Sequence, residues 1–305
     1  MYTPGTDMTR VILRESTAHD PEVMMNSEST VRSPSPWPFF VLTFGWTWLF
    51  LIPAALTGMN ADALPVLVLR LLAGVGPMVS ALLLIYRASD RRARADYWQR
   101  LLSPGRIPAR WWAVLLLTPP LLTGLSALVD LVLGGTGLRL EAAASFVDRP
   151  LAVLPFMAFT LLFGPIPEEM GWRGYALDGL QARWNALSSS LILGVLWAAW
   201  HLPLFFIEGT FQAELGLGTL SFWIFMLSMI PQTLTMTWIY NNTHRSTLSA
   251  VLFHFMLNFT GELFELSQRA DVILFGMWIG LAMLVITLCG PARLCRMRGE
   301  RVPNG

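Results

Sequence analysis

The chain has 305 residues, of which 54% are hydrophobic and only 13% are charged, and its mean hydropathy is +0.53. These values are typical of a polytopic membrane protein and argue against an ordinary soluble domain. The net charge is +1 and the arginines are dispersed along the chain, so nucleic-acid binding is set aside. Two cysteines, Cys289 and Cys295, form no disulfide framework or metal-binding motif.

A bilayer core about 30 Å thick needs roughly 20 apolar residues in a helix. Residues 1–36 precede the first such stretch; they are polar, mixed in charge and rich in Ser, Thr and Pro, which predicts a flexible tail. The apolar stretches then span residues 37–57, 64–86, 111–133, 150–172, 187–207, 219–240, 247–266 and 271–290. We therefore expect an all-α polytopic membrane protein of about eight transmembrane helices, with a membrane domain at 37–291 and a basic C-terminal tail at 292–305.

The arginine-rich loops predict the orientation in a cytoplasmic membrane, because short positively charged loops remain in the cytoplasm. The loop between the second and third stretches and the C-terminal tail are rich in arginine. The loop after the fifth stretch contains Glu208 and Glu214 and no arginine. With eight crossings the arginine-rich segments share one side, and both termini are expected in the cytoplasm.

Ionisable and polar groups within the apolar stretches are the strongest functional signal, because each costs a few kcal/mol in a bilayer unless it is paired or lines a cavity. Three segments contain them: GPIPEEMGWRGYAL with Glu168, Glu169 and Arg173, LWAAWHLPLFF with His201, and FHFMLNF with His254 and Asn258. Asp130 lies toward the outer end of its helix, where snorkelling to the interface is the ordinary explanation.

Depth along the helices is compatible with one shared site. If the fourth helix continues to about residue 182, Glu168 and His201 each lie roughly 21 Å above the cytoplasmic ends of their helices. His254 and Asn258 lie roughly 10 and 17 Å above the start of theirs. A spacing of four residues also places His254 and Asn258 on one helical face.

The fourth stretch is expected to bend beside the glutamates. Gly164, Pro165 and Pro167 directly precede them, and these residue types break or kink a helix and free backbone groups. Freed backbone groups are tolerated at membrane depth only beside protein or a water-filled cavity. The Glu169 to Arg173 spacing of four residues places that pair on one face.

Together these segments resemble the CPBP family of intramembrane proteases, which includes type II CAAX prenyl endopeptidases, bacteriocin-processing enzymes and Abi-like proteins. The family pattern is EExxxR, then an aromatic residue followed by xxxH, then HxxxN or HxxxD, on successive membrane helices. Here it reads EEMGWR at 168–173, WAAWH at 197–201 and HFMLN at 254–258. The resemblance covers about 150–265, and the loop and Trp pair around 95–112 are similar too. Trp197 stands where the family more often has Phe.

The resemblance implies hydrolysis of peptide bonds inside the membrane, with peptides or prenylated proteins as substrates and membrane lipids around the site. A carboxylate beside an imidazole can take a proton from water, so Glu168 with His201 is the predicted base. His254 and Asn258 are predicted to donate hydrogen bonds to the oxyanion. The expected catalytic set is Glu168, Glu169, His201, His254 and Asn258, with Arg173 and Trp197 as structural support.

Whether a metal takes part is left open by the sequence. Glu168, His201 and His254 could hold a single zinc ion with water in the fourth position. Against this, the chain has no HExxH motif and no helix with two histidines at ligand spacing. Catalysis by glutamate without a cofactor is therefore modestly preferred.

Two other classes of protein remain as alternatives. Buried polar groups also hold membrane helices together, as they would in a non-catalytic membrane scaffold or a bacteriocin-immunity protein. A secondary transporter could use the acids as a proton relay, but the inverted repeats expected of such a transporter are not detectable.

Overall fold

The computed structural model describes residues 35–295. Nearly all of the predicted N-terminal tail and most of the predicted C-terminal tail lie outside the described residues. Within that range the chain is helical, apart from the two-residue strands β1 (Leu138–Arg139) and β2 (Glu265–Leu266). These strands pair antiparallel, with Leu138 opposite Leu266. The all-α prediction is confirmed.

Seven helical segments of the described chain are long and apolar enough to cross a membrane. They are Trp37–Leu56, Leu64–Ala88, Ala109–Val132, Pro150–Gln181, Ala186–Phe206, Leu220–Asn242 and Gln268–Cys289. The protein is thus a polytopic membrane protein, and seven of the about eight expected helices reach this length. The difference is α14 (Thr247–Leu263), whose 17 residues rise roughly 25 Å.

Three of these segments, Leu64–Ala88, Pro150–Gln181 and Ala186–Phe206, are interrupted or change their helical type along their length. The elements of the bundle are α2 (Trp37–Leu56), α3 (Leu64–Gly74), α4 (Gly76–Ala88), α6 (Ala109–Val132), η2 (Pro150–Ala152), α8 (Val153–Phe163), α9 (Pro165–Gly171), the π-helix η3 (Trp172–Ala176), α10 (Leu177–Gln181), α11 (Ala186–Trp200), η4 (Leu202–Phe206), α13 (Leu220–Asn242) and α15 (Gln268–Cys289). Shorter elements connect them: α5 (Arg91–Leu102), η1 (Pro104–Arg106), α7 (Glu141–Asp148) and α12 (Phe211–Leu215).

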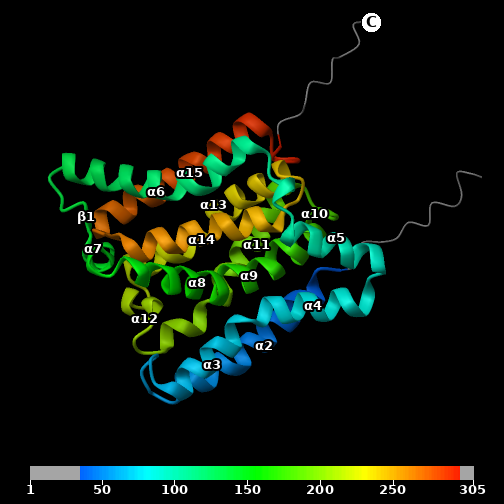
Figure 1. The fold of residues 1–305 in the computed structure, drawn as a ribbon, viewed down its shortest axis with the longest axis horizontal. Helices are drawn as coiled ribbons and strands as arrows, with labels where there is room; N and C mark the ends of the chain where they lie inside the picture. The colour runs from blue at the N-terminus through cyan, green and yellow to red at the C-terminus, as the bar shows by residue number, and fades with distance from the viewer. Residues whose placement is uncertain (1–34, 296–305) are drawn as a thin grey trace, which may run out of the picture. The chain divides into compact units, whose positions relative to one another are not determined.

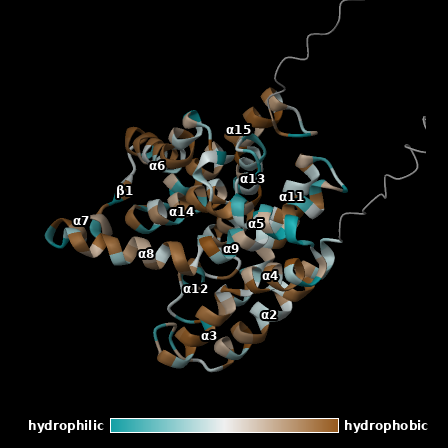
Figure 2. Cartoon of the chain, turned by 45° about the vertical axis from the view of Figure 1, so that its right-hand side comes forward, coloured by the Kyte–Doolittle hydropathy of each residue, from teal (hydrophilic) through white to brown (hydrophobic). Residues whose placement is uncertain are grey.

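The helices α11, α13 and α14 form the centre of the bundle, with α6 and α15 on one side and α2, α3 and α4 on the other (Figure 1). In the 18-residue apolar stretch of each segment, half of the residues are buried in Ala186–Phe206 and in α13, compared with 17% in α15. Hydrophobic residues cover α6, α8 and α15 (Figure 2), and many of their large apolar side chains are exposed. In a bilayer these side chains meet lipid rather than water.

The break expected before the glutamates is confirmed at Gly164. This residue has φ −128° and ψ −90°, outside the helical region, and separates α8 from α9. Pro165 then occupies the first position of α9, where its missing N–H costs nothing and its fixed φ suits the helix. The sequence did not predict the π-helix that follows at Trp172–Ala176, a feature that is frequent at functional sites.

Asp130 is buried rather than snorkelling to the interface, so that interpretation was wrong. Its side chain is completely buried and accepts hydrogen bonds from Gly137 N at 2.9 Å and Ser267 Oγ at 2.7 Å. It also forms an ion pair with Arg269. A buried carboxylate needs such partners, and these tie the end of α6 to the start of α15.

Close packing of α11 against α13 depends on Gly194. A Cβ placed there would lie 2.9 Å from the Cα of Ile230 and 3.2 Å from the carbonyl oxygen of Met229. Small residues at helix interfaces allow backbones to approach each other in membranes. Seven residues further along, α11 ends and η4 begins at His201, so this close contact lies about two turns from the histidine on the same helix.

We predict that Gly194→Ala destabilises the protein by about 1–3 kcal/mol, because the new methyl group overpacks a backbone contact. The measurement is thermal unfolding in detergent followed by circular dichroism. Gly276→Ala in α15 is the matched control, because nothing lies within 4 Å of its Cβ position. That change should be neutral or stabilising, since alanine favours a helix over glycine by roughly 0.5–1 kcal/mol. Equal effects of the two variants would contradict the packing role of Gly194.

Candidate active site

The indole of Trp197 joins the residues that the sequence predicted as a site. Its Nε1 donates a hydrogen bond to Glu168 Oε2 at 2.7 Å. Its ring centroid lies 5.2 Å from that of His254 and 5.9 Å from that of His201, both in edge-on geometry. The Cζ of Arg173 lies 5.1 Å from the ring centroid. Residues from α9, the π-helix, α11 and α14 therefore meet around one side chain.

Glu168 is buried, but a small part of its surface remains accessible. Its Oε2 also faces the Nε1 of Trp172 at 3.4 Å, and 8% of the residue surface remains exposed. Among the contacts of the described residues, Oε1 has no hydrogen-bond partner. One carboxylate oxygen is therefore held by indole N–H groups while the other is free to contact a water molecule or a substrate.

Glu169 is completely buried and has different partners. Both of its carboxylate oxygens accept from Arg173 Nη1, at 2.8 and 3.0 Å. Its Oε1 also lies 2.9 Å from His254 Nδ1. A carboxylate only accepts when ionised, so Nδ1 carries the proton and the contact fixes the orientation of the imidazole. In this arrangement Glu169 orients its neighbours and has no free oxygen.

His201 is held by the end of its own helix. Its Nδ1 lies 2.8 Å from the carbonyl oxygen of Trp197, and a carbonyl only accepts. The Nδ1 therefore carries the proton, and in the neutral ring Nε2 is left with a lone pair. The ring packs edge-on against Trp200 and Phe225, with centroids 4.8 and 5.6 Å away.

Asn258 lies one turn beyond His254 on α14 and is half-buried. Its Nδ2 lies 3.4 Å from the position that a Cβ would take at Gly164. The amide is therefore next to the backbone break that precedes the glutamates, and a larger residue at 164 would crowd it. All five predicted catalytic residues come from elements that pack together.

The side chains proposed for zinc do not fit a metal ion in this arrangement. Among residues 35–295, no group of three or more His, Cys, Asp or Glu side chains has the geometry to hold one. No reaction step is therefore derived through a metal.

Sequence reasoning missed one member of the site, Trp172. It lies four residues after Glu168, within the EEMGWR motif, so the spacing that paired Glu169 with Arg173 also placed this indole beside Glu168. The signal was present, but tryptophan within an apolar stretch is ordinarily a packing or interfacial residue.

Comparison with known proteins agrees with the resemblance drawn from the motifs. Residues 150–260 match the family described as Type II CAAX prenyl endopeptidase Rce1-like. The chain is also similar to CAAX prenyl protease 2 of Methanococcus maripaludis, with 28% identity over 254 residues, which cover 83% of this chain and 93% of that protein. All three motifs lie within the matched residues. The chain is thus a multi-pass integral membrane protein that is similar, over residues 150–260, to the Rce1-like type II CAAX prenyl endopeptidase family.

Proposed function

We propose that the protein is an intramembrane endopeptidase that hydrolyses peptide bonds of membrane-associated or lipidated substrates with water activated by Glu168 and His201. The observation that carries this proposal is the meeting of Glu168, His201 and His254 around the indole of Trp197, within helices of membrane length. The match of residues 150–260 to a family of prenyl endopeptidases supports it.

Glu168 is the better candidate for the base of the two glutamates. Its Oε1 is free, whereas Glu169 is engaged by Arg173 and His254. In the proposed reaction Glu168 takes a proton from water, and the water oxygen bonds to the carbonyl carbon of the scissile peptide. The resulting intermediate collapses when the proton passes to the amide nitrogen, which leaves as an amine.

The histidines have complementary roles in this scheme. His201 presents Nε2 as a lone pair, which can accept a hydrogen bond from the attacking water and orient it toward Glu168. His254 and the amide of Asn258 supply donors for the oxyanion that forms on the carbonyl oxygen. Since Nδ1 of His254 is bound to Glu169, its Nε2 is the atom available to the substrate, and it donates only in the doubly protonated ring.

The position of the site and the name of the relative both support a lipid-anchored peptide as the substrate. The chemistry lies within membrane-length helices whose outward surface is apolar, so a substrate that is itself anchored in the bilayer reaches it without leaving lipid. The relative from Methanococcus maripaludis is named as a CAAX prenyl protease. A prenylated C-terminal peptide is accordingly the first substrate to test.

We predict that Glu168→Gln lowers kcat for cleavage of such a peptide by roughly 10²–10⁴-fold, because an amide cannot accept the proton from water. The measurement is a cleavage assay on protein purified in detergent or lipid discs, with products identified by mass spectrometry. The variant keeps the shape of the side chain, so its thermal unfolding should match that of the wild type.

Glu265→Gln in β2 is the matched control, because its carboxylate is exposed and contacts only Arg139 among the described residues. It should retain wild-type cleavage. A scaffold, an immunity protein or a transporter would show no cleavage in the wild type either. Full activity of Glu168→Gln would contradict the assignment of the base.

We predict that cleavage persists after treatment with a strong zinc chelator, because the described side chains do not gather into a metal site. The measurement compares initial rates before and after chelation and after removal of the chelator, alongside the metal content of the purified protein. Loss of activity on chelation and its return with zinc would overturn metal-free catalysis.

For the orientation, we propose that the end of the bundle carrying α5 faces the cytoplasm, as do both termini. Segments rich in arginine gather there: Arg106 is hydrogen-bonded to His244 in the turn between α13 and α14, and Asn241 binds the carbonyl of Arg293. The elements α7, β1 and α12 lie at the opposite end (Figure 1). Although short, α14 connects the two ends and supplies the eighth crossing.

A single-cysteine labelling experiment tests this orientation. In a Cys289→Ser background, Cys295 should react with a membrane-impermeant maleimide only after cells are permeabilised. Ser145→Cys, made in a protein without its native cysteines, places a thiol on the exposed surface of α7 and should react in intact cells. The reverse pattern would invert the proposed topology.

A further inference from the structure

The buried guanidinium of Arg173 is held by few contacts. Its Nη1 binds Glu169 and its Cζ lies over the ring of Trp197. Among the described residues its Nε and Nη2 have no hydrogen-bond partner, although the side chain is completely buried. Side-chain contacts therefore fix only one nitrogen of the group. The direction of the side chain depends largely on the backbone that carries it.

That backbone is the π-helix Trp172–Ala176, which is an unusual conformation. A π-helix interrupts the regular ladder of hydrogen bonds in an α-helix and is seldom stable by itself. In this protein, side chains from α5 donate to carbonyl groups on either side of Arg173. Tyr97 Oη donates to the carbonyl of Met170 at 3.0 Å. Arg100 Nη2 donates to the carbonyl of Gly174 at 3.0 Å.

Tyr97 and Arg100 form one buried unit on α5. Their spacing of three residues places them on one helical face, and their exposed fractions are 1% and 4%. Burial raises the pKa of the Tyr97 phenol, so the hydroxyl stays protonated and can donate. A Cβ at Gly174 would lie only 3.2 Å from Tyr97 Cε2, which shows how closely the ring lies against the π-helix.

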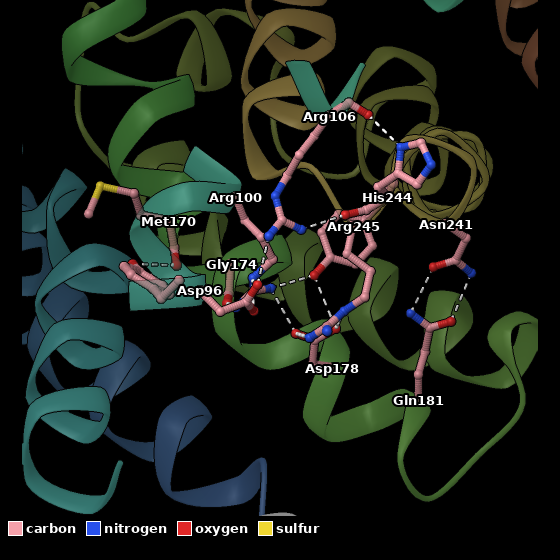
Figure 3. A network of polar contacts seen from close by, with 12 residues as sticks. Asp96, Arg100, Arg106, Met170, Gly174, Asp178, Gln181, Asn241, His244 and Arg245 are labelled. Atoms are coloured by element: carbon pink, nitrogen blue, oxygen red, sulfur yellow. Dashed lines mark hydrogen bonds and ion pairs between the residues drawn. The ribbon is translucent and has the colours of Figure 1, made fainter. Parts of the chain in front are cut away.

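Arg100 is in turn fixed by a polar network beyond the site (Figure 3). Its Nη1 donates to Asp178 Oδ2 at 2.8 Å and to Tyr240 Oη at 2.6 Å, and its Nε lies 3.0 Å from Asp96 Oδ2. Asp178 also pairs with Arg245. A buried charge with this many partners has a well-defined position, so the bond to Gly174 is made from a rigid base.

We infer that Tyr97 and Arg100 are positioning residues, which hold the π-helix in the conformation that directs Arg173 onto Glu169. Through Glu169 this contact sets the orientation of His254. Neither residue contacts the groups that react. The inference rests on the proposed function, since it concerns the geometry of that same site.

The first test is Tyr97→Phe, which removes one hydroxyl and keeps the ring. We expect kcat for peptide cleavage to fall roughly tenfold to a hundredfold, since small misplacements of catalytic groups cost that much, while KM changes little. The pH midpoint of kcat should also shift, because a displaced Arg173 alters the charge around Glu169 and His254. A loss of folded protein would instead scale the whole pH profile and leave its midpoint in place.

Tyr86→Phe is the matched control. It is the same chemical change at a half-exposed side chain of α4, whose hydroxyl accepts from Trp98 Nε1 on α5 at 3.1 Å and makes no hydrogen bond to residues 170–176 among the described contacts. It should leave kcat and the pH midpoint unchanged. Unchanged values in Tyr97→Phe, or an equal loss in Tyr86→Phe, would overturn the inference.

Hydrogen exchange measured by mass spectrometry separates this inference from the proposed function. Amides in peptides covering 170–178 should exchange faster in Tyr97→Phe than in the wild type, with no change in Tyr86→Phe. If the wild type cleaves no peptide, the proposed function fails, and unchanged exchange would show separately that α5 does not hold the π-helix. Faster exchange with unaltered kcat and pH midpoint would overturn the positioning role.

Discussion

The site depends on how two adjacent carboxylates are neutralised within a helix of membrane length. Burial of an ionised carboxylate is costly unless charge and hydrogen bonds compensate it. Glu169 receives the full compensation, from Arg173 and His254. Glu168 receives only neutral indole donors on one oxygen. This unequal treatment gives neighbouring residues of the same type different chemistry, because one is fixed in an ion pair and the other keeps an oxygen free to react.

The side chain of Trp197 contacts Glu168 as well as the two partners of Glu169. Its N–H orients Glu168, while its ring packs against both imidazoles and the guanidinium. Each imidazole is oriented through Nδ1, by a backbone carbonyl for His201 and by a carboxylate for His254. Both rings thus offer Nε2 to a substrate, although they are fixed by unrelated partners. A phenylalanine at position 197 would preserve the packing and lose the hydrogen bond to Glu168.

The sequence predicted the helical class, most helix positions and the grouping of the polar residues, because apolar length and four-residue spacing are local properties. It could not separate the roles of Glu168 and Glu169, which depend on partners from α11 and α14. Nor could it predict the π-helix or the burial of Arg100, which counts in sequence as one more loop arginine. Asp130 was misjudged for the same reason: its partners Gly137 and Ser267 come together only when α6 and α15 pack. The helix α14 is shorter than the expected stretch 247–266 because it ends at Leu263.

The close approach of α9 to α4 bears on whether residues 150–260 could pack without the upstream helices. A Cβ at Gly171 would lie 2.5 Å from Pro77 Cβ. The helix α9, which carries both glutamates, therefore packs closely against α4, and α4 precedes the family-matched residues 150–260. Tyr97 and Arg100 reach these residues from the same upstream half. The matched segment therefore depends on upstream residues for its packing. A truncation to residues 150–260 would remove the helices that hold α9 and the π-helix in place.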